Sequence, residues 1–532
     1  GYGHEKILTQ IIIDGMTLRL LELKGYTPDT ILKKDEICSL KSTANISTGG
    51  TAIDRTDEVH PDNIFLFERI AKIIGLDIAG IDVVAPDITT PLTENGGGIV
   101  EINAAPGFRM HLAPSEGIAR NVAEPVVNML FPAGEKFRIP IIAVTGTNGK
   151  TTTTRLISHI LKNVGKTVGF TTTEGVYIGN RLIKAGDNTG PVSAQMVLRD
   201  PTVDIAVLET ARGGLLRAGL GYDGCDIGIV MNVTADHLGL KDIDSLEDMA
   251  RVKAIVAENV FKSGYAVLNA DDKLVLAMKD RLSCNVALFS MDENNEAVKA
   301  HTNKGGIACV YENHFITLLK GHWKLRVEKV INIPLTYQGK AAFMIQNVLA
   351  ATLASYILHG VSIEDIKFSL SSFVPSVTQT PGRLNLIDVG NFTVLIDFAH
   401  NPAGMEALSI KTGIIGGTGD RRDEDIKNLG KAAAKMLTNI IIREDESLRG
   451  RKEGEVHNLM LEGIKSEKPD VPVKVITDEV EALNFGLKNA KKNELLIILP
   501  DNIPRAIKIV NEFRDKLNKI KIEQSDIPNI NE

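Results

Sequence analysis

Cysteine is scarce in this chain of 532 residues. The 4 cysteines, Cys38, Cys225, Cys284 and Cys309, stand far apart, and no two of them have the short spacing of a metal-binding pair. Such a pattern excludes a disulfide framework and a zinc module. We therefore expect reduced and mostly buried thiols in an intracellular protein.

Long apolar runs and an excess of basic charge are also absent. No segment approaches the roughly 20 consecutive apolar residues that cross a bilayer. The first residues, "GYGHEKILTQIIIDGM", lack the order of basic, apolar and small residues found in secretion signals. The formal net charge of −7 argues against non-specific nucleic-acid binding, which requires a basic surface. These absences predict a cytoplasmic protein whose partners include neither membrane nor nucleic acid.

The turn residues and the alternation of elements predict three domains. Pro132, Gly134 and Pro140 mark a linker after a first zone that mixes strand-like and helical runs. Beyond the linker, continuous apolar strands such as "IPIIAVTG" and "VDIAVLET" alternate with helices, which is typical of a parallel sheet covered on both faces. A second α/β series starts near "SVTQTPGRLNLID". We expect domains at 1–135, 136–375 and 376–532.

The segment "AVTGTNGKTTTT" predicts a phosphate-binding loop between a strand and a helix. Gly146 and Gly149 leave backbone amides open to phosphate oxygens, and Lys150 reaches the terminal phosphates. Thr151 or Thr152 offers a hydroxyl to Mg²⁺, and the helix points its positive end at the same anion. A plain turn, the alternative, would not require a lysine followed by four threonines. The first glycine of the common P-loop pattern is replaced here by valine.

Polar side chains also end the neighbouring strands of this predicted sheet. Glu209 closes "VDIAVLET" at the edge where α/β sheets place ligands, and its carboxylate is a suitable ligand for Mg²⁺. Asn232, Asp236 and His237 end the next strand and are candidates for the metal or phosphate shell. A structural hydrogen bond is the alternative for His237.

Several segments together resemble the Mur ligase family. They are "GTNGKTTTT", "NVTADHLG", "QNVLAATLAS", "PGRLNLI" and "DFAHNPAGMEAL". Mur ligases activate a carboxylate with ATP as an acyl phosphate, which an amine attacks to form an amide. Further segments are similar to cyanophycin synthetases, which build an aspartate backbone decorated with arginine. These are "STGGTAIDRTDEVHPDN", "IVEINAAPGFRMH", "GDNTGPVSAQMVL", "LETARGGLLRAGLG" and "GGTGDRRDEDI".

The resemblance implies a fold and an activity. The fold is α/β, with a Mur ligase-like P-loop central domain and a smaller Rossmann-like C-terminal domain, preceded by a partial α+β ATP-grasp domain. The implied enzyme is a ligase that forms carbon–nitrogen bonds with ATP and Mg²⁺, acting as a homo-oligomer. Its implied partners are L-arginine, L-aspartate and a poly-aspartate or cyanophycin primer. In this family an ATP-grasp module adds aspartate to the backbone, and a Mur-like module adds arginine to the aspartate side chain.

The resemblance also implies roles for individual residues. The catalytic residues that it implies are Lys150, Glu209, His237 and His400. The implied nucleotide-binding residues are Gly146, Thr147, Asn148, Gly149, Lys150, Thr151, Thr152, Asn347 (adenine), Arg383 (phosphate or ribose) and Asp397 (ribose). The implied metal ligands are Thr151, Glu209, His237 and a carbamylated Lys253, with Asp82, Glu101 and Asn103 in the ATP-grasp module. Without the resemblance, Lys253 would be a solvated helix residue.

The charged loop "REDESLRGR" is the predicted site for substrate arginine, because its place resembles the amino-acid-recognising loop of the Mur ligases. A guanidinium calls for a pair of carboxylates, which Asp445 and Glu446 could supply, while Arg449 pairs with the substrate carboxylate. A solvated charged loop is the alternative. Asp420 and Arg421 likewise either contact substrate or cap the following helix.

Two features depart from the family pattern. The chain begins with Gly1 rather than Met and opens inside the ATP-grasp module, so we expect a piece of a longer chain that is incomplete for aspartate addition. The segment "NPAGMEALSIKTGIIGG" is shorter than expected by roughly a dozen residues, which predicts the loss of a helix. One alternative is a subunit that binds nucleotide and either has no catalytic activity or completes a split enzyme. Another is a Mur or folylpolyglutamate-type ligase that acts on another acid. A motor or GTPase is disfavoured because no switch-like segment accompanies the loop.

Overall fold

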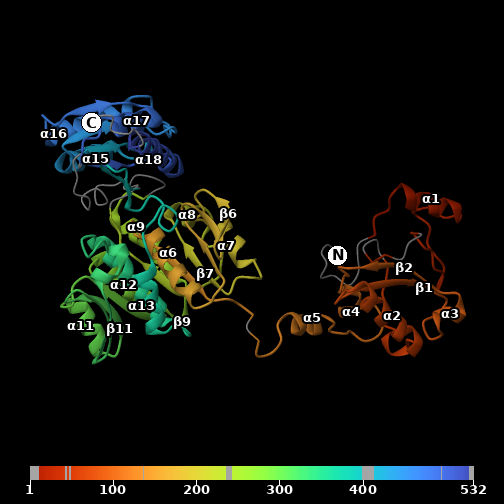
Figure 1. Ribbon diagram of the computed structural model, residues 1–532. Helices are drawn as coiled ribbons and strands as arrows, with labels where there is room; N and C mark the ends of the chain where they lie inside the picture. The colour runs from red at the N-terminus through yellow and green to blue at the C-terminus, as the bar shows by residue number, and fades with distance from the viewer. Residues whose placement is uncertain are drawn as a thin grey trace. The chain divides into compact units, whose positions relative to one another are not determined.

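The computed structural model describes residues 11–41, 45–46, 50–135, 137–234, 243–397, 412–492 and 494–525, with side chains up to residue 517. The chain divides into two compact units, Gly1–Arg138 and Ile139–Glu532 (Figure 1). The division into three domains at 135 and 375 stays a prediction.

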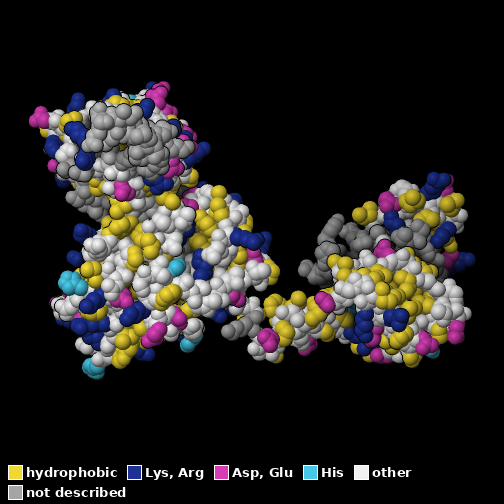
Figure 2. Space-filling view, in the orientation of Figure 1, with side chains coloured by type: hydrophobic (Ala, Val, Ile, Leu, Met, Phe, Trp, Pro, Cys, Tyr) yellow, Lys and Arg dark blue, Asp and Glu magenta, His cyan; other side chains and the backbone are white. Residues whose placement is uncertain are grey.

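The first unit contains little regular structure and a thin core. Strands β1 (Gly80–Val84) and β2 (Gly98–Asn103) form a two-stranded antiparallel sheet. The helices around it are α1 (Gly15–Leu23), α2 (Pro61–Ile74), α3 (Leu92–Asn95), α4 (Arg109–Leu112) and α5 (Ala123–Leu130). Among the described residues of this unit, the buried hydrophobic side chains are Leu21 and Leu92. Figure 2 shows apolar side chains gathered on the visible face of the unit.

The second unit is built on an 11-stranded sheet. In spatial order its strands are β13 (Trp323–Lys329), β12 (Phe315–Lys320), β11 (Ile307–Glu312), β10 (Asn285–Ser290), β9 (Val260–Asn269), β8 (Cys225–Val230), β3 (Ile141–Thr145), β7 (Ile205–Glu209), β4 (Val168–Thr171), β5 (Gly175–Ile178) and β6 (Arg181–Ala185). Neighbours from β11 to β4 are parallel, as predicted. The hairpins at both ends are antiparallel, which the sequence analysis did not anticipate.

Helices cover both faces of this sheet because its central strands are apolar on both sides. In β3, Ile142 and Val144 pack toward α6 (Lys150–Asn163) and α12 (Ala342–Ile357), whereas Ile141 and Ala143 belong to the opposite core. Helix α13 (Ile363–Ser372) joins the first layer, and α7 (Pro191–Leu198), α9 (Leu246–Glu258) and α11 (Glu296–Asn303) form the second (Figure 1).

A second, 6-stranded sheet follows in the C-terminal part of the same unit. Its spatial order is β14 (Asn385–Asp388), β15 (Thr393–Ile396), β19 (Leu495–Ile498), β16 (Thr412–Ile415), β17 (Asn439–Ile442) and β18 (Val473–Val475). All neighbours except β14 and β15 are parallel. Its helices are α15 (Asp423–Met436), α16 (Glu455–Glu467), α17 (Glu479–Asn489) and α18 (Ile503–Ser525). The predicted smaller α/β series therefore has the expected topology.

Two further expectations concern cysteines and membranes. All four cysteines are free, and Cys225 and Cys309 are buried, whereas Cys38 and Cys284 are half-buried. Within the described parts of the chain, no helix combines the length and the apolar character needed to span a bilayer.

Candidate functional site

The phosphate loop lies where the parallel strands β3 and β7 end side by side. Val144 of β3 pairs with Glu209 of β7, so the residues that follow β3 face the carboxyl end of β7. A pocket of about 1100 Å³ opens at this edge and is lined by residues that end or follow strands of both sheets in the second unit. Open α/β sheets bind ligands at this edge.

The shape of the loop depends on glycine and on a distant asparagine. Gly146 and Gly149 have φ values of 151° and 86°, which L side chains rarely adopt. Asn232, at the end of β8, accepts hydrogen bonds through Oδ1 from the amides of Thr147 (3.1 Å) and Asn148 (2.8 Å). Asn232 therefore braces the loop from the neighbouring strand.

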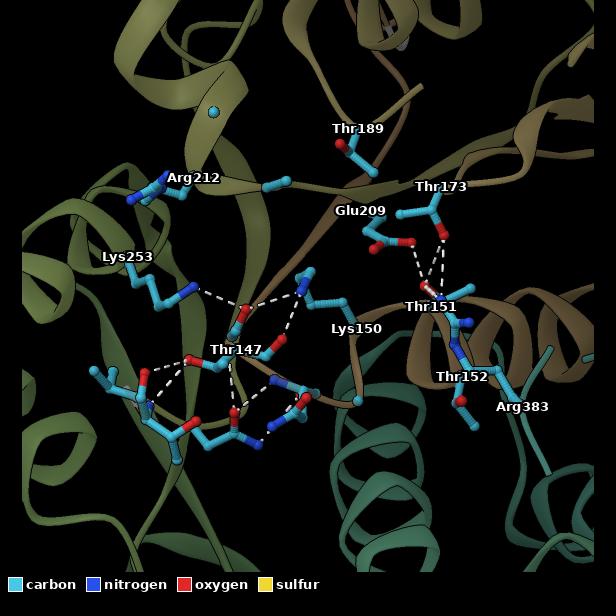
Figure 3. Close-up of a pocket in the computed structure, with 18 of the residues that line it drawn as sticks. Thr147, Lys150, Thr151, Thr152, Thr173, Thr189, Glu209, Arg212, Lys253 and Arg383 are labelled. Atoms are coloured by element: carbon cyan, nitrogen blue, oxygen red, sulfur yellow. Dashed lines mark hydrogen bonds between the residues drawn. The ribbon is translucent and has the colours of Figure 1, made fainter. Parts of the chain in front are cut away.

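Two lysines donate to the same loop carbonyl (Figure 3). Lys150 Nζ lies 3.1 Å and Lys253 Nζ 2.8 Å from the oxygen of Gly146, and Lys150 also donates to Thr147 O at 2.9 Å. Lys253 is buried rather than solvated. Its ammonium supports the loop backbone, and its role as a carbamylated metal ligand stays a prediction.

Thr151 and Glu209 form a buried polar pair in the site. Thr151 Oγ1 donates to Glu209 Oε2 at 2.9 Å, and Glu209 is only 2% exposed. Its Oε1 atom has no hydrogen-bond partner among the described residues. Burial raises the pKa of Glu209 to about 7, although the positive charges of Lys150 and Arg383 lower it. An unpartnered carboxylate oxygen beside a hydroxyl is a donor set that suits a hard divalent cation.

Arg383 reaches this pair from the segment that follows α13. Its Nη2 lies 3.2 Å from Thr151 Oγ1 and 3.3 Å from Thr173 Oγ1. Sequence reasoning missed Thr173, which follows β4. The signal that could have found it is "TTTEG", a threonine run at the end of a buried strand beside β7.

Asn347 and Asp397 line the same pocket but make structural contacts. Asn347 is buried in α12 and packs against Gly149 of the phosphate loop. Asp397 Oδ2 accepts a hydrogen bond from the amide of Leu384 at 2.7 Å, and thereby holds the turn after Arg383. Thr152 lies in the first turn of α6 and is buried.

The predicted arginine-binding side chains are engaged in ion pairs. Asp445 pairs with the buried Arg443, and Glu446 pairs with Arg505. Arg449 Nη1 lies 3.0 Å from Asp420, and Asp445 and Arg449 line the pocket. Burial raises the pKa of Asp445, while Arg443 opposes the shift.

Asp420 and Arg421 do not cap the helix that follows them. Helix α15 begins at Asp423 with Arg422 at its N-cap, so neither Asp420 nor Arg421 caps it. Arg421 is buried and donates through Nε to Thr418 Oγ1 at 2.9 Å.

The candidate ligands of the first unit also come together. Asp82 and Glu101 are paired across β1 and β2. Asn103 Nδ2 lies 3.2 Å from Glu101 Oε1 and 3.4 Å from Asp82 Oδ2. Both carboxylates are exposed, unlike Glu209.

Three predicted residues lie outside the described residues: Asp236, His237 and His400. The short connection after "DFAHN", where a helix was predicted to be lost, lies there as well. In the parts of the chain that the structure describes, no three His, Cys, Asp or Glu side chains form a metal-sized cluster.

Comparisons with known proteins agree with the fold. The Mur ligase middle domain matches residues 144–355. A crystal structure of a bifunctional folylpolyglutamate synthase/dihydrofolate synthase with Mn, AMPPNP and L-glutamate bound has a TM-score of 0.52 and 19% identity, covering 73% of this chain and 92% of that one. The predicted Mur ligase-like α/β fold is confirmed, whereas the ATP-grasp part stays a prediction.

Sequence relatives are more similar still. The chain is 54% identical over 521 residues to the cyanophycin synthetase of Geminocystis herdmanii, a match covering 96% of this chain and 60% of the relative. It is 27% identical over 387 residues to the UDP-N-acetylmuramoyl-L-alanyl-D-glutamate–2,6-diaminopimelate ligase of Geobacillus thermodenitrificans, covering 68% of this chain and 73% of that one. The resemblance to cyanophycin synthetases is confirmed, and the chain spans about 60% of the length of these relatives. One relative is named a synthetase and the other a ligase, which supports the prediction of a carbon–nitrogen ligase.

Proposed function

We propose that residues 139–532 form an ATP-dependent amide ligase that adds arginine to the aspartate side chains of cyanophycin. The observation that carries this proposal is the convergence of Lys150, Thr151 and Glu209 at the carboxyl edge of β3 and β7, with an unpartnered oxygen on the buried Glu209. The similarity to cyanophycin synthetases supports the choice of substrate.

In the first step, the aspartate side-chain carboxylate attacks the γ-phosphorus of ATP. A new O–P bond forms, the bond to the β,γ-bridging oxygen breaks, and ADP leaves. Positioning and charge neutralisation are the main requirements of this transfer. The loop amides bind the phosphates, and Lys150 and Arg383 supply positive charge at the terminal phosphate.

Mg²⁺ fits the residues present, because the hydroxyl of Thr151 and the free oxygen of Glu209 are hard ligands. When bound, it neutralises the charge that the triphosphate carries. A bound cation would favour the ionised form of the Glu209 carboxyl group, whereas burial alone favours the protonated form.

In the second step, the α-amine of arginine attacks the carbonyl carbon of the acyl phosphate. The C–N bond forms, inorganic phosphate leaves with the electrons of the C–O bond, and the amine loses a proton. The guanidinium stays protonated and is not a nucleophile. Asp445, Glu446 and Arg449 remain the candidates for arginine recognition, which would require their ion pairs with Arg443, Arg505 and Asp420 to rearrange.

For residues 1–138 we propose a part of an aspartate-adding module, as the similarity to cyanophycin synthetases suggests. Asp82, Glu101 and Asn103 are the candidate metal ligands of that reaction. The cytoplasmic location and the homo-oligomeric state stay predictions.

The decisive experiment measures ADP release by the purified chain with Mg²⁺, ATP, arginine and a poly-aspartate primer. Release that requires arginine supports arginine addition. Release only with a folate or a cell-wall precursor and its amino acid would instead favour a ligase acting on another acid. Nucleotide binding without release under any of these conditions would indicate a non-catalytic subunit or one half of a split enzyme.

A further inference from the structure

A carboxylate that the sequence analysis did not single out lies between two arginines beside the phosphate loop. Glu174 follows β4, and its side chain is only 16% exposed. Its Oε2 lies 3.3 Å from Arg155 Nη2, and its Oε1 lies 3.6 Å from Arg383 Nη2. The two oxygens of one carboxylate thus face two different guanidinium groups.

Arg155 is a fixed support for this carboxylate. It is buried in α6, and its Nη2 donates to Tyr177 Oη at 3.0 Å. Its guanidinium carbon lies 4.9 Å from the centre of the Tyr177 ring, which stacks on Phe170 at 4.6 Å. A guanidinium held by a ring face, a phenol oxygen and a carboxylate loses most of its rotational freedom. Arg155 therefore fixes the position of Glu174.

Arg383, the second guanidinium, lies on a connecting segment. It belongs to the segment between α13 and β14, outside both sheets, and its own segment holds it through Gly382 O, to which Nη1 donates at 3.1 Å. Its Nη2 faces Thr151 and Thr173. Glu174 supplies a negative charge that attracts this guanidinium, and removing Glu174 would remove that attraction.

The turn that carries Glu174 is held mainly by groups other than its carboxylate. The amide of Thr172 donates to Gly175 O at 2.8 Å, and the amide of Glu174 donates to Thr172 Oγ1 at 3.2 Å. The carbonyl of Glu174 accepts from the amide of Gly186 at 3.0 Å. Thr173 Oγ1 also donates to Glu174 Oε1 at 3.1 Å, so one contact of the carboxylate stays within the turn, while backbone groups supply most of the hydrogen bonds of the turn.

We propose that Glu174 is a positioning residue that holds Arg383 at the terminal-phosphate end of the nucleotide site. The inference rests on the proposed function, because it requires that a nucleoside triphosphate binds at the phosphate loop. It adds that the affinity for the terminal phosphates depends on a carboxylate that does not itself contact the nucleotide.

The test compares Glu174→Gln, Arg383→Gln and the double variant by calorimetric titration with the β,γ-imido analogue of ATP and, separately, with adenosine. Each single variant is expected to weaken binding of the analogue by about ten-fold, as for a coupled charged pair. Adenosine binding should not change. The double variant should bind the analogue no more weakly than Arg383→Gln, and Glu174→Asp should restore part of the affinity.

The matched control is Glu258→Gln, which removes a surface carboxylate whose Oε1 lies 3.5 Å from Arg281; it should change neither affinity. Additive losses in the double variant, an equal loss of adenosine binding, or unchanged binding in Glu174→Gln would each overturn the inference.

A measurement without nucleotide separates this inference from the proposed function. Amide hydrogen exchange of the segment 376–385 should be faster in Glu174→Gln than in the parent chain, because Arg383 loses one of its charged contacts. Faster exchange confined to 172–178 would mean that Glu174 only stabilises its own turn. If the parent chain binds no triphosphate, the proposed function fails, whereas the exchange result still reports whether Glu174 holds Arg383.

Discussion

The two units place candidate metal-binding carboxylates in opposite environments. Asp82 and Glu101 stand exposed on a two-stranded sheet. Glu209 ends a central strand of an 11-stranded sheet and is 2% exposed. An exposed carboxylate is satisfied by water, whereas a buried one with a free oxygen costs free energy unless a cation or donor arrives. Burial therefore makes the second site far more informative about function than the first.

The same contrast applies to the cores. The first unit leaves large apolar side chains such as Ile73 (72% exposed) and Val84 (70%) at its surface, while Ile157 in the second unit is fully buried. A two-stranded sheet is marginally stable by itself. The second unit can therefore hold a site rigidly, and the described part of the first unit has fewer means to do so.

The largest expected effect tests which unit turns over ATP. Lys150→Ala should lower ADP release by at least about 100-fold, because it removes a charge that acts on the transferred phosphoryl group. Circular dichroism should show an unchanged fold. Lys72→Ala, on the exposed surface of α2, is the control and should have full activity. Retained turnover in a folded Lys150→Ala protein would mean that Lys150 is not part of the ATP site, and that the second unit is not the one that turns over ATP through this loop.

Core substitutions test the difference in packing. Ile157→Ala should lower the free energy of unfolding of the second unit by about 2–5 kcal/mol, because it leaves a cavity in a fully packed core. Ile73→Ala should change stability by less than about 0.5 kcal/mol, since that side chain is exposed. Urea denaturation of both variants measures the difference. Similar losses would mean that Ile73 is covered in solution.

Metal dependence tests the two carboxylates directly. Glu209→Gln should raise the Mg²⁺ concentration required for half-maximal nucleotide binding by at least about ten-fold. Glu101→Gln, the same chemical change in the first unit, should leave it unchanged. If Glu209→Gln weakened metal-free nucleotide binding to the same extent, a structural role would explain its burial better than a ligand role.

The smallest expected effect concerns acid stability. Hydrogen bonds from Arg326, and then from Lys324 and Thr317, lower the pKa of Glu312 to about 2 against its burial. Because the folded pKa lies below the unfolded value, this interaction stabilises the fold above pH 4.5 and is lost as the pH falls toward 2. Both cations are about half exposed, so we expect about 1 kcal/mol or less. Glu312→Gln should flatten this part of the pH–stability curve, and an unchanged curve would contradict the assignment.

The features predicted correctly from the sequence are those that depend on residues close together in the chain. The loop from Gly146 to Thr151 and the placement of Glu209 followed from apolar strands and the residues that end them. The partners of these residues come from distant segments: Arg383 is 232 residues from Thr151, and Lys253 is 107 residues from Gly146. No local period encodes such contacts, which is why the contacts of Thr173 and Glu174 with Arg383 were missed.

Charged loops were the hardest to interpret from sequence. "REDESLRGR" suggested free carboxylates for a ligand. The carboxylate of Asp445 instead pairs with Arg443 of the same segment, and that of Glu446 pairs with Arg505 of α18. Whether a loop charge is available to a ligand depends on which cations the fold brings to it.

The packing of Gly149 against Asn347 has a consequence for recombination between homologous genes. A methyl group at position 149 would collide with the Asn347 side chain, and its backbone φ of 86° independently disfavours any other residue. Glycine at position 149 is therefore matched to asparagine at position 347, although 198 positions separate the two. A chimaera of two homologous genes with a crossover between these positions would inherit the two partners from different parents, and it would keep the loop intact only where both parents encode the same pair.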